Sequence, residues 1–176
     1  MKAIALGLIL ALAVMGPAVA DDAGALHAAA VGFYGVYGTF HPSDGIPDDK
    51  DRLKYHPFLS PRLEDLLQQA AQAQARFAAA NKGSPPLIEG DLFTSLFEGA
   101  TAVSVGACGG DGQKGECSVA LRFDDPGSKP TPWTDTVYLV NTPQGWKVDD
   151  VAYGGSWAFG NKGRLSATLA QVIHFQ

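Results

Sequence analysis

The chain has 176 residues, of which 46% are hydrophobic and 18% are charged, ordinary values for one globular domain with a real core. Its 13 basic and 18 acidic side chains give a net charge of −5, and removal of Lys2 with the leader described next makes this −6. That balance argues against binding to nucleic acid or to anionic membrane surfaces, because both require basic patches.

Residues 1–20 have the three parts of a cleavable secretory signal peptide. Lys2 supplies the positive charge, residues 4–15 form an uninterrupted apolar run, and Ala18-Val19-Ala20 presents small residues where signal peptidase reads the chain. This run is too short to span a membrane, which takes about 20 residues, and no later run is long enough. No cysteine lies at the cleavage site, so no lipid anchor is expected. We predict cleavage after Ala20, a periplasmic or secreted location, and a single α+β domain over residues 21–176.

Two helices and a loop are predicted in the first half of the mature chain. Apolar positions in residues 25–40 recur every three or four residues, the period of one buried helical face. Ser60 and Pro61 open a second helix, with an N-cap hydroxyl and a proline at its first position, and Asn81-Lys82-Gly83 ends it. The acidic segment 41–57 between them predicts an exposed, irregular loop. The buried face of the first helix is expected to comprise Leu26, Ala30, Phe33, Tyr34, Tyr37 and Phe40.

The second half of the chain changes to the period of two that is typical of strands. Asp91 is first expected to cap a short helical turn that runs to Phe97. Short loops with Gly and Pro join the strands that follow, which favours antiparallel pairing, and a closing helix is predicted over residues 164–175. The predicted strands span residues 101–108, 117–123, 133–141 and 146–153.

Cys108 and Cys117 flank a glycine-rich turn between two of these strands. Cysteines at opposing ends of a hairpin come within bonding distance, and an exported chain meets an oxidising environment. We therefore predict a structural disulfide. A redox pair or a zinc site is disfavoured, because the spacing is not Cys-x-x-Cys and two thiols do not fill a zinc shell.

Four stretches along the chain carry characteristic packing and turn residues. They are Phe33-Tyr34-Gly35-Val36-Tyr37, Leu59-Ser60-Pro61-Arg62-Leu63, Gly90-Asp91-Leu92-Phe93 and Gly145-Trp146-Lys147-Val148-Asp149-Asp150-Val151. Together they resemble exported bacterial proteins grouped as domain of unknown function 3828, over roughly residues 25–172. The resemblance implies a nuclear transport factor 2-like, or cystatin-like, cone, in which helices fill the concave side of a curved antiparallel sheet of about four strands. It implies no activity, and the two-cysteine hairpin departs from the family.

Asp149 and Asp150 form the most conspicuous pair of candidate site residues. Two carboxylates near the mouth of a cone suit acid–base catalysis or cation binding. Adjacent strand residues point to opposite faces unless a bulge intervenes, so only one of them is expected to line a cavity. The structural alternative is that one aspartate fixes a loop or neighbouring backbone while the other is solvated.

Aromatic residues from other elements complete the candidate set. A tyrosine on the first helix of a cone can donate a hydrogen bond to a developing oxyanion, although most such aromatic stripes are simply core. Asp91 is a further candidate, with capping as its competing role. The candidate ligand-binding residues are Tyr34, Tyr37, Asp91, Asp149, Asp150, Tyr153 and Trp157.

The residues that other kinds of catalytic or binding site would need do not occur at the spacing those sites require. His27, His41, His56 and His174 have no second histidine three or four residues away, as a zinc site would need. No serine stands in a Gly-x-Ser-x-Gly setting, no glycine-rich loop opens a helix to hold phosphate, and the acidic segment lacks the ligand order of a calcium loop. We therefore predict no catalytic residue, metal or cofactor.

The favoured function is a non-catalytic binding domain of the periplasm that recognises another protein or a small ligand. The loops at 41–57 and 109–116 are the expected contact surface, because long loops often carry function. One alternative is a small cone-fold lyase, isomerase or hydrolase that uses Asp149 or Asp150 with a helix tyrosine. Another is an immunity-type inhibitor, whose acidic surface would suit a basic secreted toxin.

Overall fold

The computed structural model describes residues 19–39 and 45–175, so most of the expected signal peptide lies outside the described residues. The helices are α1 (Val19–Thr39), α2 (Asp49–Tyr55), the single-turn 3₁₀ helix η1 (His56–Phe58), α3 (Pro61–Ala80) and α4 (Leu165–Ile173). The strands are β1 (Ala102–Gly110), β2 (Lys114–Phe123), β3 (Thr131–Thr142), β4 (Gly145–Tyr153) and β5 (Gly163–Arg164).

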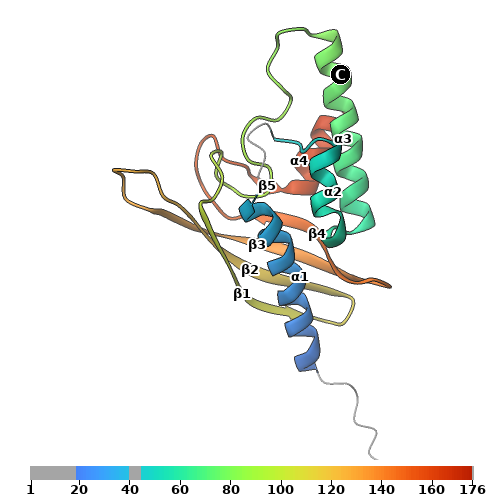
Figure 1. Cartoon of the computed structure of the whole chain (residues 1–176), viewed down its shortest axis with the longest axis vertical. Coiled ribbons are helices and arrows are strands. Elements are labelled where there is room, and N and C mark those ends of the chain that lie inside the picture. Colours follow the sequence, from blue (N-terminus) through green and yellow to red (C-terminus); the bar gives the residue numbers. More distant parts are fainter. Residues whose placement is uncertain (1–18, 40–44, 176) are drawn as a thin grey trace, which may run out of the picture.

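The five strands found in the described residues form one antiparallel sheet in the order β1-β2-β3-β4-β5 (Figure 1). Each long strand pairs with the next along the chain, as short connections dictate. The α+β class and the helices packed on a curved antiparallel sheet are thus confirmed. The two-residue strand β5 was not predicted, because two residues are too few to show a period.

Helix α1 lies against the sheet and packs chiefly on β1, near one end of the meander (Figure 1). Its predicted buried face is confirmed from Leu26 to Tyr37, while Phe40 lies outside the described residues. Glycine at position 115 allows the close approach, because a Cβ there would lie only 2.6 Å from Leu26 Cδ2. The helix begins at Val19, before the expected cleavage site, rather than at residue 25.

The acidic segment that was predicted to be an irregular loop is helical over residues 49–58, so that prediction was wrong. Asp48 caps α2, its side chain accepting a hydrogen bond from the Asp51 amide at 2.8 Å. Tyr55 is fully buried and anchors the two turns to the core. A single buried position gives no periodic pattern, which is why the helix was missed. Residues 41–44 lie outside the described residues.

Helix α3 begins where the sequence predicted, with Ser60 Oγ accepting a hydrogen bond from the Leu63 amide at 3.0 Å. Leu59 forms a parallel bridge to Val148, which places the start of α3 beside the edge of β4. Helices α3 and α4 pack on each other and on β4 (Figure 1). Among the described helices, none combines the length and hydrophobicity needed to cross a bilayer.

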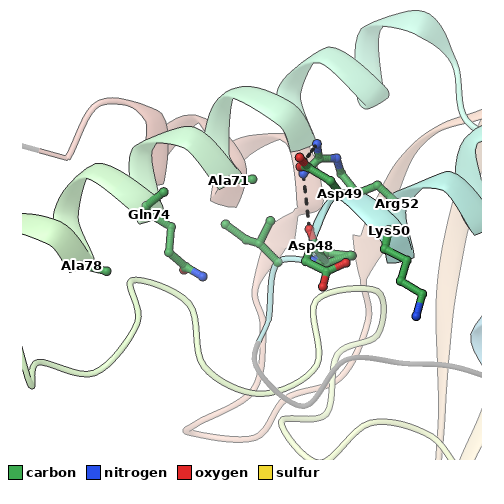
Figure 2. Close-up of a pocket in the computed structure, with 10 residues that line it drawn as sticks. Asp48, Asp49, Lys50, Arg52, Ala71, Gln74 and Ala78 are labelled. Carbon is green, nitrogen blue, oxygen red and sulfur yellow. Dashed lines mark hydrogen bonds and ion pairs between the residues drawn. The ribbon is translucent and has the colours of Figure 1, made fainter.

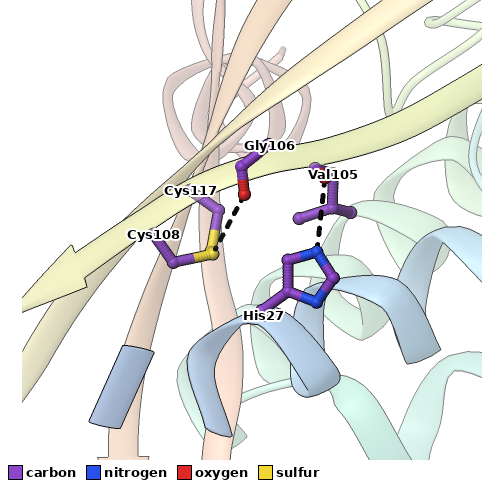
Figure 3. The surroundings of a disulfide bond; sticks show 5 residues. All are labelled: His27, Val105, Gly106, Cys108 and Cys117. Atoms are coloured by element: carbon purple, nitrogen blue, oxygen red, sulfur yellow. Dashed lines mark hydrogen bonds between the residues drawn. A yellow bond between two sulfur atoms is a disulfide. The ribbon is translucent and has the colours of Figure 1, made fainter. Parts of the chain in front are cut away.

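The predicted disulfide is confirmed. Cys108 and Cys117 lie directly opposite each other on β1 and β2, with their Cα atoms 4.1 Å apart (Figure 3). The turn that they flank is tighter than expected, because both strands continue to Gly110 and Lys114. On the neighbouring helix, His27 Nε2 lies 3.3 Å from the carbonyl oxygen of Val105, so α1 also contacts the backbone of this edge strand.

Candidate functional site

Asp149 and Asp150 lie at a β-bulge in β4. The pairing with β3 steps from Val148 to Asp150 and leaves Asp149 as the extra residue, so the two carboxylates do not diverge as they would in a regular strand. Both face Arg62, whose Nη2 is 2.8 Å from Asp149 Oδ2 and 3.9 Å from Asp150 Oδ2. Asp150 is the buried member of the pair, and Asp149 is half-buried.

Asp149 is held in an ion pair. Arg62 donates to both of its carboxylate oxygens, and Ser60 Oγ donates to Oδ1 at 2.5 Å. Partial burial alone would raise the pKa of Asp149, but the hydrogen bonds from Arg62 and Ser60 and the charge of Arg62 outweigh it and lower the pKa below its ordinary value. A carboxylate held in this way is a weak base, and its evident role is to fasten the start of α3 to β4.

Asp150 caps α4 from a neighbouring strand. Its carboxylate accepts hydrogen bonds from the Ser166 amide at 3.0 Å and the Ser166 hydroxyl at 2.6 Å, in the first turn of that helix. Arg164 Nη1 lies 3.6 Å from the same group. Negative charge at a helix N-terminus is favourable, so this aspartate stabilises the closing helix.

The predicted tyrosines do gather, in the packed interior between α1 and the sheet. Tyr34 and Tyr37 have ring centroids 6.0 Å apart, Tyr37 Oη accepts a hydrogen bond from the Ala100 amide at 2.7 Å, and Tyr153 Oη donates to the Leu92 carbonyl at 2.7 Å. Burial raises the pKa of all three phenols, so they stay neutral. This placement fits the core-packing interpretation.

The enzyme alternative requires the aspartates and helix tyrosines to converge. The hydrogen bonds that described residues donate to the side chains of Asp149 and Asp150 come from Ser60, Arg62, Val151 and Ser166, and none comes from a tyrosine. The candidate residues therefore divide among three places: Asp149 and Asp150 at the bulge in β4, Asp91 with the tyrosine cluster, and Trp157 apart from both.

Asp135, which was not a candidate, is a buried carboxylate with four recorded hydrogen-bond donors. It is 1% exposed and accepts hydrogen bonds from the Ser95 amide at 2.9 Å, the Ser95 hydroxyl, Trp133 Nε1 at 3.1 Å and the Gly154 amide at 2.8 Å. Trp133 belongs to β3, whereas Ser95 and Gly154 belong to two irregular segments that precede and follow β3 in the sequence. The available sequence signal was an aspartate at an inward position of a predicted strand, between Trp133 and Val137.

The first irregular segment, residues 89–98, was expected to be partly helical. Asp91 does act as a cap, accepting from the Phe93 amide at 2.8 Å and the Thr94 amide at 2.7 Å, but the chain continues as a series of bends and not as a helix. Ser95 instead bonds to partners outside the segment: its amide donates to Asp135 Oδ2 at 2.9 Å, and its Oγ accepts from the Gly155 amide at 2.9 Å.

Asn161 joins this segment to the second one, residues 154–162. Its side-chain amide donates to the carbonyls of Asp91 and Thr94, both at 2.7 Å, and its backbone amide donates to the Ser95 carbonyl at 2.8 Å. Two segments without regular structure are thus fixed to each other and, through Asp135, to β3. Such preorganisation lowers the entropy lost on binding.

Together the two segments form a groove of about 520 Å³, which we call the aromatic groove. Phe159 is 89% exposed and Phe97 is 42% exposed, while Trp157 packs edge-on against Trp133 with ring centroids 5.2 Å apart. Its lining residues are Glu89, Leu96, Phe97, Glu98, Trp157, Phe159 and Gly160. Of these, the sequence had singled out Trp157 alone.

The two loops predicted as contact surfaces also border hollows. One of about 600 Å³ lies between α2 and α3, and two of its charged residues form an ion pair, with Arg52 Nη2 2.7 Å from Asp49 Oδ1 (Figure 2). The other, of about 400 Å³, borders the β1–β2 turn and is lined by three glycines, three charged residues and the half-buried Tyr138. Although the first is larger than the aromatic groove, neither presents exposed aromatic side chains on a fixed backbone.

Compared with family models, curated proteins and solved structures, the chain has no match in any of the three. Among the described residues, no three His, Cys, Asp or Glu side chains are grouped so that they could hold a metal ion.

Proposed function

We propose that this chain is an exported, non-catalytic binding domain that recognises another protein through the aromatic groove. The observation that carries the proposal is a network of hydrogen bonds from Asp135, Ser95 and Asn161 that fixes two irregular segments. These segments carry the exposed aromatic side chains of Phe97 and Phe159. Large exposed aromatic residues on a rigid backbone are typical anchors of protein interfaces.

The export part of the proposal is supported by the signal-peptide pattern of residues 1–20 and by the disulfide, which fits an oxidising compartment. A nuclear transport factor 2-like cone is the fold we propose for this arrangement of helices on a curved sheet, in line with the family resemblance. The enzyme alternative has less support, because Asp149 and Asp150 are both engaged in holding helices in place.

Photo-crosslinking tests the proposal in the protein's own compartment. We expect a photoreactive benzoylphenylalanine at position 159 to form a specific adduct with a partner protein in the native host. Position 53, where Leu53 is 71% exposed on α2, is the matched control and should give no such adduct. Equal adducts at both positions, or none at position 159, would contradict a protein-binding role for the groove.

A further inference from the structure

We infer that the partner inserts a segment carrying lysine or arginine next to an apolar side chain into the aromatic groove. This inference rests on the proposed function and specifies the chemistry of the partner. Three independent features of the groove support it: its charge, its aromatic lining and its shape.

The charge of the groove is negative and uncompensated. Glu89 and Glu98 are both exposed and line it, and the lining contains no basic side chain. Neither glutamate forms an ion pair within the described part of the chain, whereas Asp49, Asp149 and Asp150 each lie within ion-pair distance of an arginine. The groove therefore keeps two carboxylates available to an incoming cation, on a protein whose overall charge is also negative.

The aromatic lining favours the same kind of ligand. Phe97, Trp157 and Phe159 offer π systems that attract a lysine ammonium or an arginine guanidinium, and the alkyl stem of either residue packs on apolar surface. The chain already uses this interaction internally, where the Arg164 guanidinium lies 4.1 Å from the centre of the Tyr138 ring. An anionic partner would meet repulsion from both glutamates.

The shape of the groove favours a protein segment over a small free cation. Phe159 lines the hollow but is 89% exposed, so a ligand confined to the hollow would cover only part of that ring. A polypeptide can place a basic side chain between the glutamates and cover Phe159 with a neighbouring apolar side chain. The occupant we infer is therefore a basic, partly apolar stretch of another chain.

Three blocked eight-residue peptides test the inference against the mature protein. In each peptide leucine alternates with one other residue, which is lysine, serine or glutamate. Binding is measured by fluorescence anisotropy. Chemical-shift changes of the backbone amides of residues 89–98 and 157–160 show where on the protein the peptide binds. We expect the lysine peptide to bind about tenfold more tightly than the serine peptide and the glutamate peptide to bind least. Because two charge pairs at an exposed rim are involved, the double variant Glu89→Gln/Glu98→Gln should weaken the lysine peptide by about 3- to 10-fold. Added salt should weaken it as well.

The double variant Glu116→Gln/Asp125→Asn removes the same charge from exposed positions outside the groove lining and should leave binding unchanged. If all three peptides bind equally well and Phe159→Ala abolishes the binding of each, the inference about charge is overturned and the proposed function stands. Lysine-peptide binding that shifts no groove amide, or equal loss in both charge variants, would overturn the inference too. If no peptide binds and the benzoylphenylalanine at position 159 forms no adduct in cells, both the inference and the proposed function fail.

Discussion

Burying a carboxylate without a neighbouring cation destabilises the folded state unless hydrogen bonds replace the lost hydration. Asp135 meets that condition through four donors from Ser95, Trp133 and Gly154. The four donors come from three places: two from Ser95 in a bent segment, one from Trp133 in β3 and one from Gly154 in the loop that leaves β4. The single side chain thereby sets the relative position of the two walls of the aromatic groove.

Replacing this residue should have a large and specific effect. We expect Asp135→Asn to lower the free energy of unfolding by about 3 kcal/mol, because an amide nitrogen would face donors where an oxygen now accepts. Urea unfolding measures the loss, and the exposed Asp125→Asn should change stability by less than about 0.5 kcal/mol. Comparable midpoints for the two variants would show that Asp135 does not hold the site together.

The tyrosine cluster offers a matched pair of single-atom deletions. Tyr37 Oη accepts from the Ala100 amide, whereas Tyr34 Oη has no hydrogen-bond partner among the described residues. We expect Tyr37→Phe to cost about 1–2 kcal/mol, because it leaves a buried amide unsatisfied, and Tyr34→Phe to be neutral or slightly stabilising. Thermal unfolding of both variants checks this. The opposite order would indicate that the Tyr34 hydroxyl has a role that its contacts do not reveal.

At the scale of elements, two consecutive aspartates of β4 join the sheet to α3 and α4 through residues at the starts of those helices. Asp149 fastens α3 through Arg62 and Ser60, and Asp150 caps α4 through Ser166. A β-bulge makes both connections possible, since it lets two consecutive aspartates serve two helices.

The ion pair of Asp149 should make stability depend on pH in a defined direction. Its pKa is lowered in the folded state, so the contribution is complete above the ordinary aspartate pKa of about 3.9 and is lost as the pH falls through the lowered value. We expect Asp149→Asn to cost about 1 kcal/mol at pH 6 and progressively less below pH 4, since the pair is partly exposed. Urea unfolding at pH 6, 4 and 3 measures this difference, and a difference that stays constant with pH would contradict the assignment.

The disulfide should stabilise the β1–β2 hairpin chiefly by restricting the unfolded chain. Because it joins cysteines 9 positions apart in the sequence, we expect Cys108→Ala/Cys117→Ala to lower the free energy of unfolding by about 2–3 kcal/mol. Reduction of the unaltered protein should give a similar loss, and the double variant should be insensitive to reductant. Circular dichroism melting curves with and without dithiothreitol compare the four samples. No change on reduction would mean that the bond is dispensable for the hairpin.

At the scale of the whole molecule, the sequence predicted what depends on local periodicity and little that depends on distant partners. The α1 face, the Ser60 cap, the four long strands and the Cys108–Cys117 pair all follow from patterns within one element or one hairpin. Helix α2 was missed because two turns show no period. The groove could not be foreseen, because Asp135 meets Ser95 across 40 positions of sequence and the segments it joins have no repeating pattern.

Maturation of the whole chain is directly testable. Intact-mass spectrometry of protein purified from the culture medium or periplasm should give a chain that starts at Asp21, in agreement with the Ala18-Val19-Ala20 pattern. A chain that retained Met1, or one found in the cytoplasm, would contradict export. Mutation of Ala20 to a bulky residue should block the cut and leave the leader attached.

The position of α1 sets an order of events for the newly made chain. This helix begins at Val19, so its first two residues fall on the leader side of the expected cut. A peptidase must bind the residues around its scissile bond in extended form, and a residue cannot be extended and helical at once. On the proposed cleavage after Ala20, processing must precede completion of α1, and the first turn of the helix would start at the newly created amino terminus. That terminus would place its positive charge at the positive end of the helix dipole, which favours fraying there, while Leu26 and the residues after it hold the rest of α1 on the sheet.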